Sequence, residues 1–490
     1  MKLKKLLLNS SYKILQGNLD IEITDIAFDS RKVKSGALFV CIPGFQVDGH
    51  DFISQAVEKG ASALVVEKDV SDIPEHITVI QVDHARQALP QLSHLFYGRP
   101  TEKVNLIGIT GTNGKTSVSF LISKILSTAG RTVGLAGTIR KQVGEKVIPF
   151  HTTTPTTPES SDLQRLFKMM VREGAEDIVM EVSSIALEQG RVDGCRFKVG
   201  VFTNLSPDHL DDHGTMENYK RAKMKLFNRC EYHVINRDDK VAEEILAMAT
   251  GSILTYGIEH EEVDLKATHI AINAEGVRFT MEYQGEKVEA AIAIPGKFSV
   301  YNALAAAAAC IPLGLSLEEI AKGLAAVEGV RGRFENVPIP SEFHVIVDYA
   351  HSPDALENVL HTIRDFVKGR VITIFGCGGD RDPSKRPLMG KIAGELSDLC
   401  ILTSDNPRTE EPETILNHIE VGIKETQCQY VSEVDRRKAI GRGLQMAKEG
   451  DVVLIAGKGH EDYQEVNGEK MHFDDVEEVK NWVKQQENVD

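Results

Sequence analysis

Short apolar runs, separated by polar segments that contain glycine, recur along the chain and predict the strands of an α/β protein. In the first hundred residues such runs occupy positions 37–42 and 63–66, with a helical stretch near 53–59 between them. Turn-forming residues at 97–101 then precede a strong new strand. We therefore expect a small N-terminal α/β domain over residues 1–101.

A regular alternation of strand, loop and helix follows in residues 102–335, with apolar runs at 106–109, 178–180, 199–202 and 233–235. This alternation predicts a parallel, doubly wound sheet. Between residues 267 and 295 the apolar period changes to two, with turns at Glu275-Gly276 and Gln284-Gly285, which predicts a small antiparallel sheet attached to this central domain. Alanine at every position of 305–309 predicts a buried helix.

A third α/β set begins after a loop that contains Pro338 and Pro340. Its apolar runs lie at 345–347, 371–375, 399–402 and 452–455, and they predict a C-terminal Rossmann-like domain over residues 336–490. Three domains also agree with the length of 490 residues, because a domain holds roughly 150 residues.

Charge and cysteine content restrict the partners and the compartment. The 56 Lys and Arg residues against 72 Asp and Glu give a net charge of −16, which argues against a broad nucleic-acid surface. The seven cysteines form no CxxC pair, as is typical of a reducing compartment. The apolar stretch near the N-terminus is too short for a signal peptide, and no run is long enough for membrane insertion. We expect a cytoplasmic monomer that binds small molecules.

A phosphate-binding loop is the most specific local motif. Gly111-Thr112-Asn113-Gly114-Lys115-Thr116-Ser117 follows a predicted strand and opens a helix whose apolar residues share one face. Backbone N–H groups and the helix N-terminus suit phosphate oxygens, Lys115 adds a positive charge, and the Thr116 hydroxyl suits Mg²⁺. The loop departs from the general P-loop at position 109, where Ile replaces Gly. The Asn-Lys-x-Asp motif expected of a GTPase is absent.

Candidate metal ligands follow two other strands. Glu181 ends the run 178–180, so its carboxylate should lie at the sheet edge beside the phosphate loop and could share Mg²⁺ with Thr116. The segment 204–214, which follows the next strand and includes His209, is rich enough in Asp and His to favour metal or phosphate chemistry.

Lys223 lies on the apolar stripe of the next helix, with Tyr219, Ala222 and Leu226. A buried amine has a lowered pKa, and a neutral amine can react with CO₂ to give an anionic carbamate that binds metal. The alternative is that the long side chain reaches past the apolar stripe to solvent, and the helix pattern alone favours this alternative.

Seven motifs together resemble the Mur ligase family, in order and over essentially the whole chain: Gly111–Thr116, Glu181–Ser184, Asn204–Asp211, Ala222-Lys223, Tyr301–Ala303, Gly332–Glu335 and Asp348–His351. The resemblance implies ATP-dependent amide-bond formation on a UDP-N-acetylmuramoyl peptide in peptidoglycan synthesis, and hence a role in cell wall biogenesis, cell shape and cell division. It also implies that Lys115 and Thr116 hold the ATP phosphates and Mg²⁺, that Glu181 and His209 bind metal, and that Lys223 is carbamylated.

The resemblance further implies the remaining contacts with nucleotide and acceptor. Asn302 would face the adenine, and Arg333 and Asp348 would reach the nucleotide. The UDP-muramoyl substrate would contact Ser30, Thr156, Thr157, Ser183, Gln189 and Arg191. Two Thr-Thr-Pro copies stand in a row at 153–158, and we prefer the second because Glu159 follows it.

The third domain indicates which amino acid is added. Asp405-Asn406-Pro407-Arg408 resembles the motif of family members that add meso-diaminopimelate to UDP-N-acetylmuramoyl-L-alanyl-D-glutamate. Arg408 can bind the distal carboxylate through two hydrogen bonds, and Asp405 can bind the distal ammonium. Lysine lacks that carboxylate. Arg381, Gly457 and Glu461 match the remaining binding positions.

Three alternatives remain: the same ligase adding L-lysine, a folylpolyglutamate synthase, and a nucleotide-regulated binding protein without catalysis. A folylpolyglutamate synthase would lack the first domain with Asp29-Ser30-Arg31 and the Asp-Asn-Pro-Arg motif.

Overall fold

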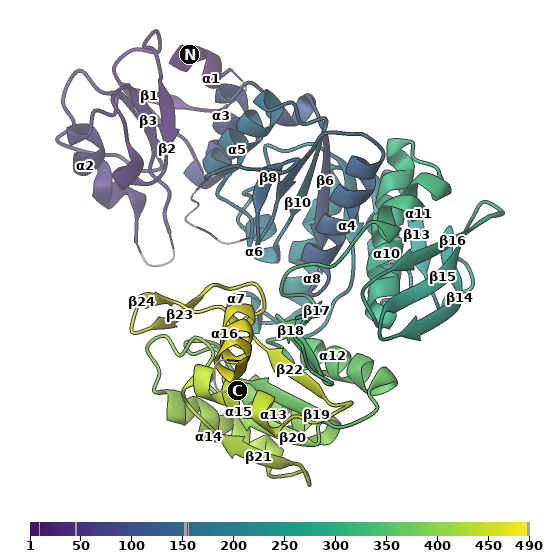
Figure 1. The fold of residues 1–490 in the computed structure, drawn as a ribbon. Helices are drawn as coiled ribbons and strands as arrows, with labels where there is room; N and C mark the ends of the chain where they lie inside the picture. Colours follow the sequence, from purple (N-terminus) through teal and green to yellow (C-terminus); the bar gives the residue numbers. More distant parts are fainter. Residues whose placement is uncertain (9, 45–46, 151–153, 155, 488–490) are drawn as a thin grey trace.

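The computed structural model describes residues 1–8, 10–44, 47–150, 154 and 156–487 of the chain. It confirms the predicted α/β class and shows three parts that follow one another along the chain (Figure 1). The N-terminal part, in purple, and the C-terminal part, in green to yellow, lie on different sides of the central part, in blue to green.

A five-stranded sheet forms the N-terminal part. Four of its strands are parallel, and β1 pairs antiparallel at one edge. In spatial order the strands are β1 (Lys13–Gln16), β5 (Thr78–Gln81), β4 (Ala63–Val66), β3 (Ala37–Val40) and β2 (Asp25–Ala27). The helices are α1 (Leu3–Leu6), α2 (Ile53–Glu58) and α3 (Ala85–Phe96).

An eleven-stranded sheet forms the central part. In spatial order its strands are β16 (Glu286–Ile292), β15 (Gly276–Tyr283), β14 (Leu265–Asn273), β13 (Ser252–Gly257), β12 (Cys230–Asn236), β11 (Phe197–Phe202), β6 (Asn105–Thr110), β10 (Asp177–Glu181), β7 (Val133–Ala136), β8 (Lys141–Val143) and β9 (Lys146–Val147). The strands from β13 to β7 pair in parallel, as predicted.

Successive side chains of the central strands enter two different cores, which explains their continuous apolar runs. Ile107 and Ile109 of β6 belong to one hydrophobic cluster, and Leu106 belongs to another. The first cluster contains the alanine run 305–309, and every residue of this run is fully buried as predicted. The helices of this part are α4 (Lys115–Thr128), α5 (Ser160–Arg172), α6 (Ser184–Glu188), α7 (Leu210–His213), α8 (Met216–Met224), α9 (Ala242–Met248), α10 (Lys297–Cys310) and α11 (Leu317–Ala325).

The predicted antiparallel strands are present, but they do not form a separate sheet. β14, β15 and β16 pair antiparallel with one another, and β14 also pairs in parallel with the end of β13. This short pairing, at Tyr256 and Gly257, joins them to the parallel sheet. The change of period therefore marks a change of strand direction within one sheet.

The C-terminal part has a six-stranded sheet that is parallel except for its edge strand β17. In spatial order the strands are β17 (Glu335–Asn336), β18 (His344–Asp348), β22 (Val452–Ala456), β19 (Val371–Phe375), β20 (Leu399–Leu402) and β21 (Gln429–Ser432), and the hairpin β23 (Tyr463–Val466) and β24 (Glu469–His472) stands apart. The helices are α12 (Pro353–Phe366), α13 (Lys385–Leu396), α14 (Pro412–Ile423), α15 (Arg436–Met446) and α16 (Asp475–Glu487), which carries Trp482, the single tryptophan of the chain.

Candidate active site

The phosphate loop connects β6 to α4 and is packed tightly on both sides. Gly111 and Gly114 have φ angles of 148° and 86°, which residues with a Cβ rarely adopt. A Cβ at Gly111 would lie 1.9 Å from Oγ1 of Thr203, and one at Gly114 would lie 2.5 Å from Oδ1 of Asn302. The loop therefore needs glycine at both positions, and Asn302 of α10 lies directly against it.

Lys115, the first residue of α4, folds back onto the loop. Its Nζ donates hydrogen bonds to the carbonyl oxygens of Gly111 at 2.9 Å and Thr112 at 2.8 Å. Burial lowers the pKa of Lys115, although the nearby carboxylates of Glu181 and Asp208 oppose the change. The amine thus lies within the loop that is expected to hold phosphates.

Thr116 and Glu181 form the pair that the sequence suggested for Mg²⁺. The Thr116 hydroxyl donates to Oε2 of Glu181 at 2.8 Å, and both side chains are buried. The other oxygen of Glu181, Oε1, accepts the backbone N–H of Thr138 at 2.8 Å. One buried carboxylate beside a hydroxyl and a phosphate loop fits the few protein oxygens that Mg²⁺ takes in nucleotide sites. Sequence reasoning missed Thr138, which follows β7 at the same sheet edge.

Lys223 of α8 is enclosed, and the structure contradicts the alternative in which its side chain reaches solvent. The residue is 3% exposed, and its Nζ donates to the carbonyl oxygen of Gly111 at 2.7 Å. The amine also lies 4.3 Å from the centre of the Tyr219 ring. Burial, together with the charge of Lys115, lowers the pKa of Lys223 well below its usual 10.5. Thr215 caps this helix, as the prediction of a helix there requires.

The Asp- and His-rich segment after β11 makes contacts in two different places. Asn204 accepts the N–H of Asn113 at 2.9 Å, which fixes the phosphate loop. His209 instead contacts Asp208 and Asp212, at 3.6 and 3.5 Å, and its side chain is 44% exposed.

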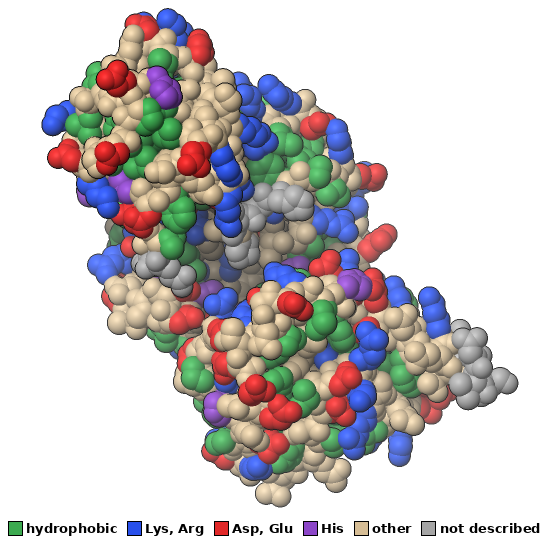
Figure 2. Space-filling view, turned by 90° about the vertical axis from the view of Figure 1, so that its left-hand side faces the viewer, with side chains coloured by type: hydrophobic (Ala, Val, Ile, Leu, Met, Phe, Trp, Pro, Cys, Tyr) green, Lys and Arg blue, Asp and Glu red, His purple; other side chains and the backbone are tan. Residues whose placement is uncertain are grey.

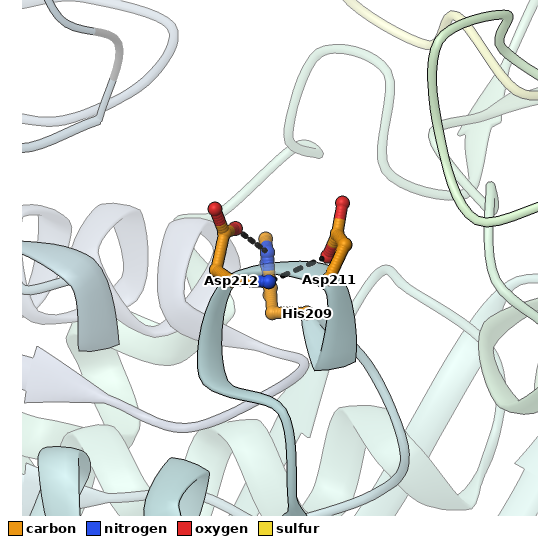
Figure 3. A group of neighbouring side chains, drawn as sticks. All are labelled: His209, Asp211 and Asp212. Atoms are coloured by element: carbon orange, nitrogen blue, oxygen red, sulfur yellow. Dashed lines mark hydrogen bonds and ion pairs between the residues drawn. The ribbon is translucent and has the colours of Figure 1, made fainter. Parts of the chain in front are cut away.

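Figure 3 shows His209, which precedes the short helix α7, beside Asp211 and Asp212 of that helix. Ligand atoms of these three exposed residues lie within 4.8 Å of one another. Among the described contacts, His209 does not touch Glu181, so the predicted pairing of these two residues on metal stays a prediction.

Residues predicted for the UDP-muramoyl substrate form a connected group beside Glu181. Thr157 donates from its hydroxyl to the carbonyl oxygen of Glu181 at 2.9 Å and accepts the N–H of Ser183 at 3.0 Å. Arg191 donates to the carbonyl oxygen of Thr157 at 3.1 Å and to Oε1 of Gln189. The second Thr-Thr-Pro copy is thus tied to the backbone of Glu181.

The two Thr-Thr-Pro copies differ in what the structure describes. Thr156, in the preferred second copy, has a φ of 53° and its hydroxyl lies 3.0 Å from that of Thr138. Thr153 and Pro155 of the first copy lie outside the described residues.

Ser30 lies in the N-terminal part, away from this group. It is 5% exposed, and its hydroxyl donates to Gln55 at 2.5 Å. Figure 2 shows a hollow between the upper and lower masses of the molecule, with Lys and Arg side chains near its rim. A cavity of about 530 Å³ also lies between the N-terminal and central parts, and Arg86 and Gln189 line it.

Contacts from the C-terminal part reach the phosphate loop. Asp354, at the start of α12, accepts from Nδ2 of Asn113 at 2.7 Å and from the Ser206 hydroxyl at 3.1 Å. Arg333, just before that part, donates to the Thr116 hydroxyl at 3.2 Å, and its contact with the nucleotide stays a prediction. Asp348 has contacts of a different kind, because its carboxylate accepts the backbone N–H groups of Phe334 and Ala350. These two hydrogen bonds hold the linker that contains Arg333.

The residues predicted for diaminopimelate meet at the carboxyl edge of the C-terminal sheet. Asp405 is 8% exposed, and its Oδ2 has no hydrogen-bond partner among the described residues. A Cβ at Gly457 would lie 2.4 Å from that oxygen, so glycine leaves room beside the carboxylate. Burial and the charge of Asp405 raise the pKa of Glu461, which accepts from Asn406 at 2.8 Å.

Arginines lie on the other side of this group. Arg408 donates to the carbonyl oxygen of Gly379 at 2.7 Å, and Arg381 is exposed nearby. Pro407 is buried and packs against Gly379. Lys458 lies within the run from Gly457 to Glu461 that the sequence matched to the amino-acid site, but it had no predicted role of its own; it is fully buried and contacts Glu461 at 3.2 Å. Its position within the motif 457–461 was the available signal.

Comparisons with known proteins agree with this geometry. Three family models match in order: the Mur ligase family catalytic domain over residues 22–97, the Mur ligase middle domain over 109–310, and the Mur ligase glutamate ligase domain over 332–459. A curated relative from Clostridium acetobutylicum, UDP-N-acetylmuramoyl-L-alanyl-D-glutamate–2,6-diaminopimelate ligase 2, is 46% identical over 98% of this chain and 99% of its own length. The chain belongs to the Mur ligase family. This membership confirms the predicted enzyme class, an ATP-dependent ligase that forms amide bonds and uses Mg²⁺.

Two further comparisons place this Mur ligase within its family. The 2,6-diaminopimelate ligase of Geobacillus kaustophilus is 48% identical and covers 94% of each chain. A solved structure titled as a UDP-N-acetylmuramoyl-L-alanyl-D-glutamate–2,6-diaminopimelate ligase matches at 32% identity with a TM-score of 0.71, over 99% of both chains. Within the described ranges of this Mur ligase, no helix is both long and apolar enough to cross a membrane.

Proposed function

We propose that this Mur ligase adds meso-diaminopimelate to the D-glutamyl γ-carboxylate of UDP-N-acetylmuramoyl-L-alanyl-D-glutamate. The observation that carries the proposal is the pocket of mixed charge in the C-terminal part. Asp405 and Glu461 suit the distal ammonium of the amino acid, and Arg381 and Arg408 suit its distal carboxylate. Asn406, Pro407 and Gly457 shape the same pocket. The curated relatives, which carry the name of this activity at 46% and 48% identity, support the assignment.

The reaction proceeds in two steps. An oxygen of the γ-carboxylate attacks the γ-phosphorus of ATP, ADP leaves, and an acyl phosphate forms. The amine of diaminopimelate, having lost a proton, then attacks the acyl carbon, and the tetrahedral intermediate expels inorganic phosphate to leave the amide. Side chains do little covalent work here, so positioning and charge neutralisation supply most of the rate.

The residues around the phosphate loop take the roles that this reaction needs. Gly111–Ser117 would hold the phosphates, with Lys115 and Arg333 opposing their negative charge. Asn302 would lie at the adenine, while Asp348 would keep the linker that carries Arg333 in place. Thr116 and Glu181, together with His209, would hold Mg²⁺. When bound, the ion neutralises phosphoryl charge.

Lys223 is proposed to be carbamylated by CO₂. The neutral amine attacks the carbon of CO₂, loses one proton and becomes a carbamate with one remaining N–H. That N–H can still donate to the carbonyl oxygen of Gly111, now 2.7 Å from Nζ, and so orient the new carboxylate. Its lowered pKa supports the proposal because it favours the neutral amine that reacts with CO₂, and the positive charge of Lys115 favours the anionic product.

The proposed division of labour assigns residues 1–101 to the UDP end of the acceptor, residues 102–335 to ATP and metal, and residues 336–490 to the amino acid. Ser30 would contact the UDP end, and Thr156, Thr157, Ser183, Gln189 and Arg191 the muramoyl end. We propose a monomer that acts in the cytoplasm, where ATP is available. Size-exclusion chromatography with light scattering tests the monomer.

A phosphate-release assay tests the function. Release should require both UDP-N-acetylmuramoyl-L-alanyl-D-glutamate and meso-diaminopimelate, and lysine in place of diaminopimelate should give little. Equal use of lysine would contradict the role of Arg408 and favour the lysine-adding ligase. Release with a folate and glutamate would indicate a folylpolyglutamate synthase, and no release with any acceptor would indicate a binding protein.

A further inference from the structure

Two loops of the C-terminal part carry the arginines of the proposed amino-acid pocket. Arg381 follows β19, and Arg408 follows β20, the neighbouring strand. The loops touch through their backbones, because the N–H of Gly379 donates to the carbonyl oxygen of Asn406 at 2.9 Å. A Cβ at Gly379 would lie only 1.9 Å from the carbonyl oxygen of Pro407. The position of one loop therefore fixes the position of the other.

Both loops adopt a backbone conformation that is unfavourable for their residues. Asp380 and Arg408 have φ angles of 52° and 51°, in the left-handed region. Such residues persist only when their surroundings hold them. The carboxylate of Asp380 accepts from the hydroxyl of Thr409 at 2.7 Å and from its N–H at 3.2 Å. This contact crosses from one loop to the other.

Glu410 and Arg386 form a stronger brace between the same loops. Arg386, at the start of α13, is fully buried and donates to both oxygens of Glu410, at 2.8 and 2.9 Å. Oε1 of Glu410 also accepts the N–H of Asp380 at 2.6 Å, and Arg386 donates to the carbonyl oxygen of Gly378 at 3.3 Å. Glu410 thus connects its own loop to the backbone on both sides of Gly379: directly at Asp380, and through Arg386 at Gly378.

In the part of the chain that the structure describes, Glu410 pairs with Arg386 and forms no ion pair with the arginines of the pocket. A Cβ at Gly378 would lie 3.0 Å from Nη1 of Arg408 and 3.7 Å from Cγ of Arg381, so the two side chains approach the same glycine. The carboxylate of Glu410 forms its ion pair with Arg386, at 2.8 Å. The carboxylate that Arg408 meets in the described residues is that of Glu465, at a longer distance of 3.8 Å.

We propose that Glu410 and Arg386 are positioning residues that hold Arg381 beside Arg408 and thereby set the preference for an amino acid with a distal carboxylate. The inference rests on the proposed function and deepens it. Neither residue needs to touch the substrate. The preference is a property of the cross-linked pair of loops, not of the arginines alone.

Kinetics of a Glu410→Gln variant test the proposal. The substitution keeps the shape of the side chain but removes the charge that Arg386 needs. We expect the KM for diaminopimelate to rise about ten- to a hundredfold, the range for losing charged hydrogen bonds, and the preference over lysine to fall by the same factor. The KM values for ATP and for the UDP-muramoyl dipeptide should stay unchanged. An unchanged KM for diaminopimelate overturns the proposal.

A matched control and a gentler variant separate positioning from folding. Glu425→Gln removes an exposed carboxylate that pairs with Lys391 at 3.3 Å, just beyond the end of α14, and should leave all constants unchanged. Thr409→Val removes only the hydroxyl contact with Asp380 and should raise the KM for diaminopimelate in the same direction by less. If Glu410→Gln fails to fold, Thr409→Val decides: an unchanged KM contradicts the brace.

A double-mutant cycle with Arg381→Ala identifies the route of the effect. If Glu410 acts through Arg381, adding Glu410→Gln to Arg381→Ala leaves the KM for diaminopimelate where Arg381→Ala alone puts it. If the KM for diaminopimelate instead rises further, by the same factor that Glu410→Gln causes alone, the proposal is wrong. Failure of the proposed function would look different, because the unaltered enzyme would then release no phosphate with diaminopimelate.

Discussion

Lys223 and Lys458 are both buried, one beside the phosphate loop and one in the C-terminal part, and their partners differ in kind. Nζ of Lys223 meets a carbonyl oxygen and the face of Tyr219. Nζ of Lys458 contacts Oε2 of Glu461 and Oδ1 of Asn406, both at 3.2 Å, and the carbonyl oxygen of Tyr463. Among the described residues, no carboxylate lies within ion-pair distance of Lys223.

This difference shows that burial alone does not decide whether a lysine is a reactive amine or a structural cation. Without a carboxylate in contact, burial drives the amine of Lys223 toward its neutral, nucleophilic form. With Glu461 in contact, the charge of Lys458 is compensated, and the pair can act as a brace for the amino-acid pocket. One lysine is thus available for chemistry with CO₂, and the other is a structural cation.

The largest effect should come from Lys223→Ala. We expect kcat to fall on the order of a thousandfold, because the carbamate that would bind the charge-neutralising metal ion is lost with the amine. Short carboxylic acids should restore part of the activity by entering the space left beside Gly111. Lys220→Ala is the control, since Lys220 lies on the same helix but pairs with exposed Glu217 and Glu244. The absence of rescue at any acid concentration would weaken the carbamate proposal.

Lys458→Met should act on stability instead. Removing the cation leaves the half-buried carboxylate of Glu461 with Asn406 as its remaining hydrogen-bond donor among the described residues, at a cost of about 3 kcal/mol, the low end for breaking a buried pair. Urea unfolding followed by the fluorescence of Trp482, which lies in the same part of the chain, measures the loss. Lys223→Met should cost much less, because no buried charge is left behind. Equal losses of unfolding free energy in the two variants would contradict the proposed difference between the two lysines.

Arg408→Ala should change selectivity more than turnover. We expect the preference for diaminopimelate over lysine to fall roughly tenfold to a hundredfold, since the distal carboxylate loses a charged hydrogen-bond donor. Competition between the two amino acids in the phosphate-release assay gives this ratio directly. Arg437→Ala serves as the control, because Arg437 is exposed and pairs with Glu478 at 2.9 Å. A preserved ratio would show that Arg408 does not read the carboxylate.

The smallest effect concerns pH. The pKa of Lys223 is lowered in the folded state, so between that value and the usual 10.5 the unfolded chain binds more protons than the folded one. Stability should therefore rise with pH in this window, by at most about 1.4 kcal/mol per pH unit. Lys223→Met should lack this contribution. Unfolding free energies of both proteins in CO₂-free buffer at three pH values test it, and parallel curves would contradict the shift.

The parts of the site that the sequence predicted well are those with several signals close together. The strand before Gly111, the loop and the helix from Lys115 occur within 24 residues, Asn105 to Thr128, and each supports the others. Lys223 was placed correctly on an apolar stripe, because helical spacing depends on neighbouring residues alone. The stripe continues through Leu226 and Phe227 into a 3-10 segment, Lys225–Arg229, so the α-helix is shorter than the stripe.

Contacts between distant segments could not be predicted in the same way. Arg386 and Glu410 are 24 residues apart, and Asn113 and Asp354 are 241 apart. No periodicity joins such pairs, because they meet only after the loops have been placed by the sheet. The enclosed state of Lys223 has the same origin, since its acceptor, the carbonyl oxygen of Gly111, is 112 residues away. For Lys223 the family resemblance, not the helix pattern, indicated the enclosed state.

The contact of Asp354 with Asn113 and Ser206 has a thermodynamic consequence. A residue of the C-terminal part touches the loop that is expected to hold the ATP phosphates. If docking of that part changes the affinity for ATP by some factor, binding of ATP must change the docking equilibrium by the same factor. If the proposed amino-acid pocket moves with Asp354, the nucleotide would then be an effector of amino-acid capture as well as a reactant.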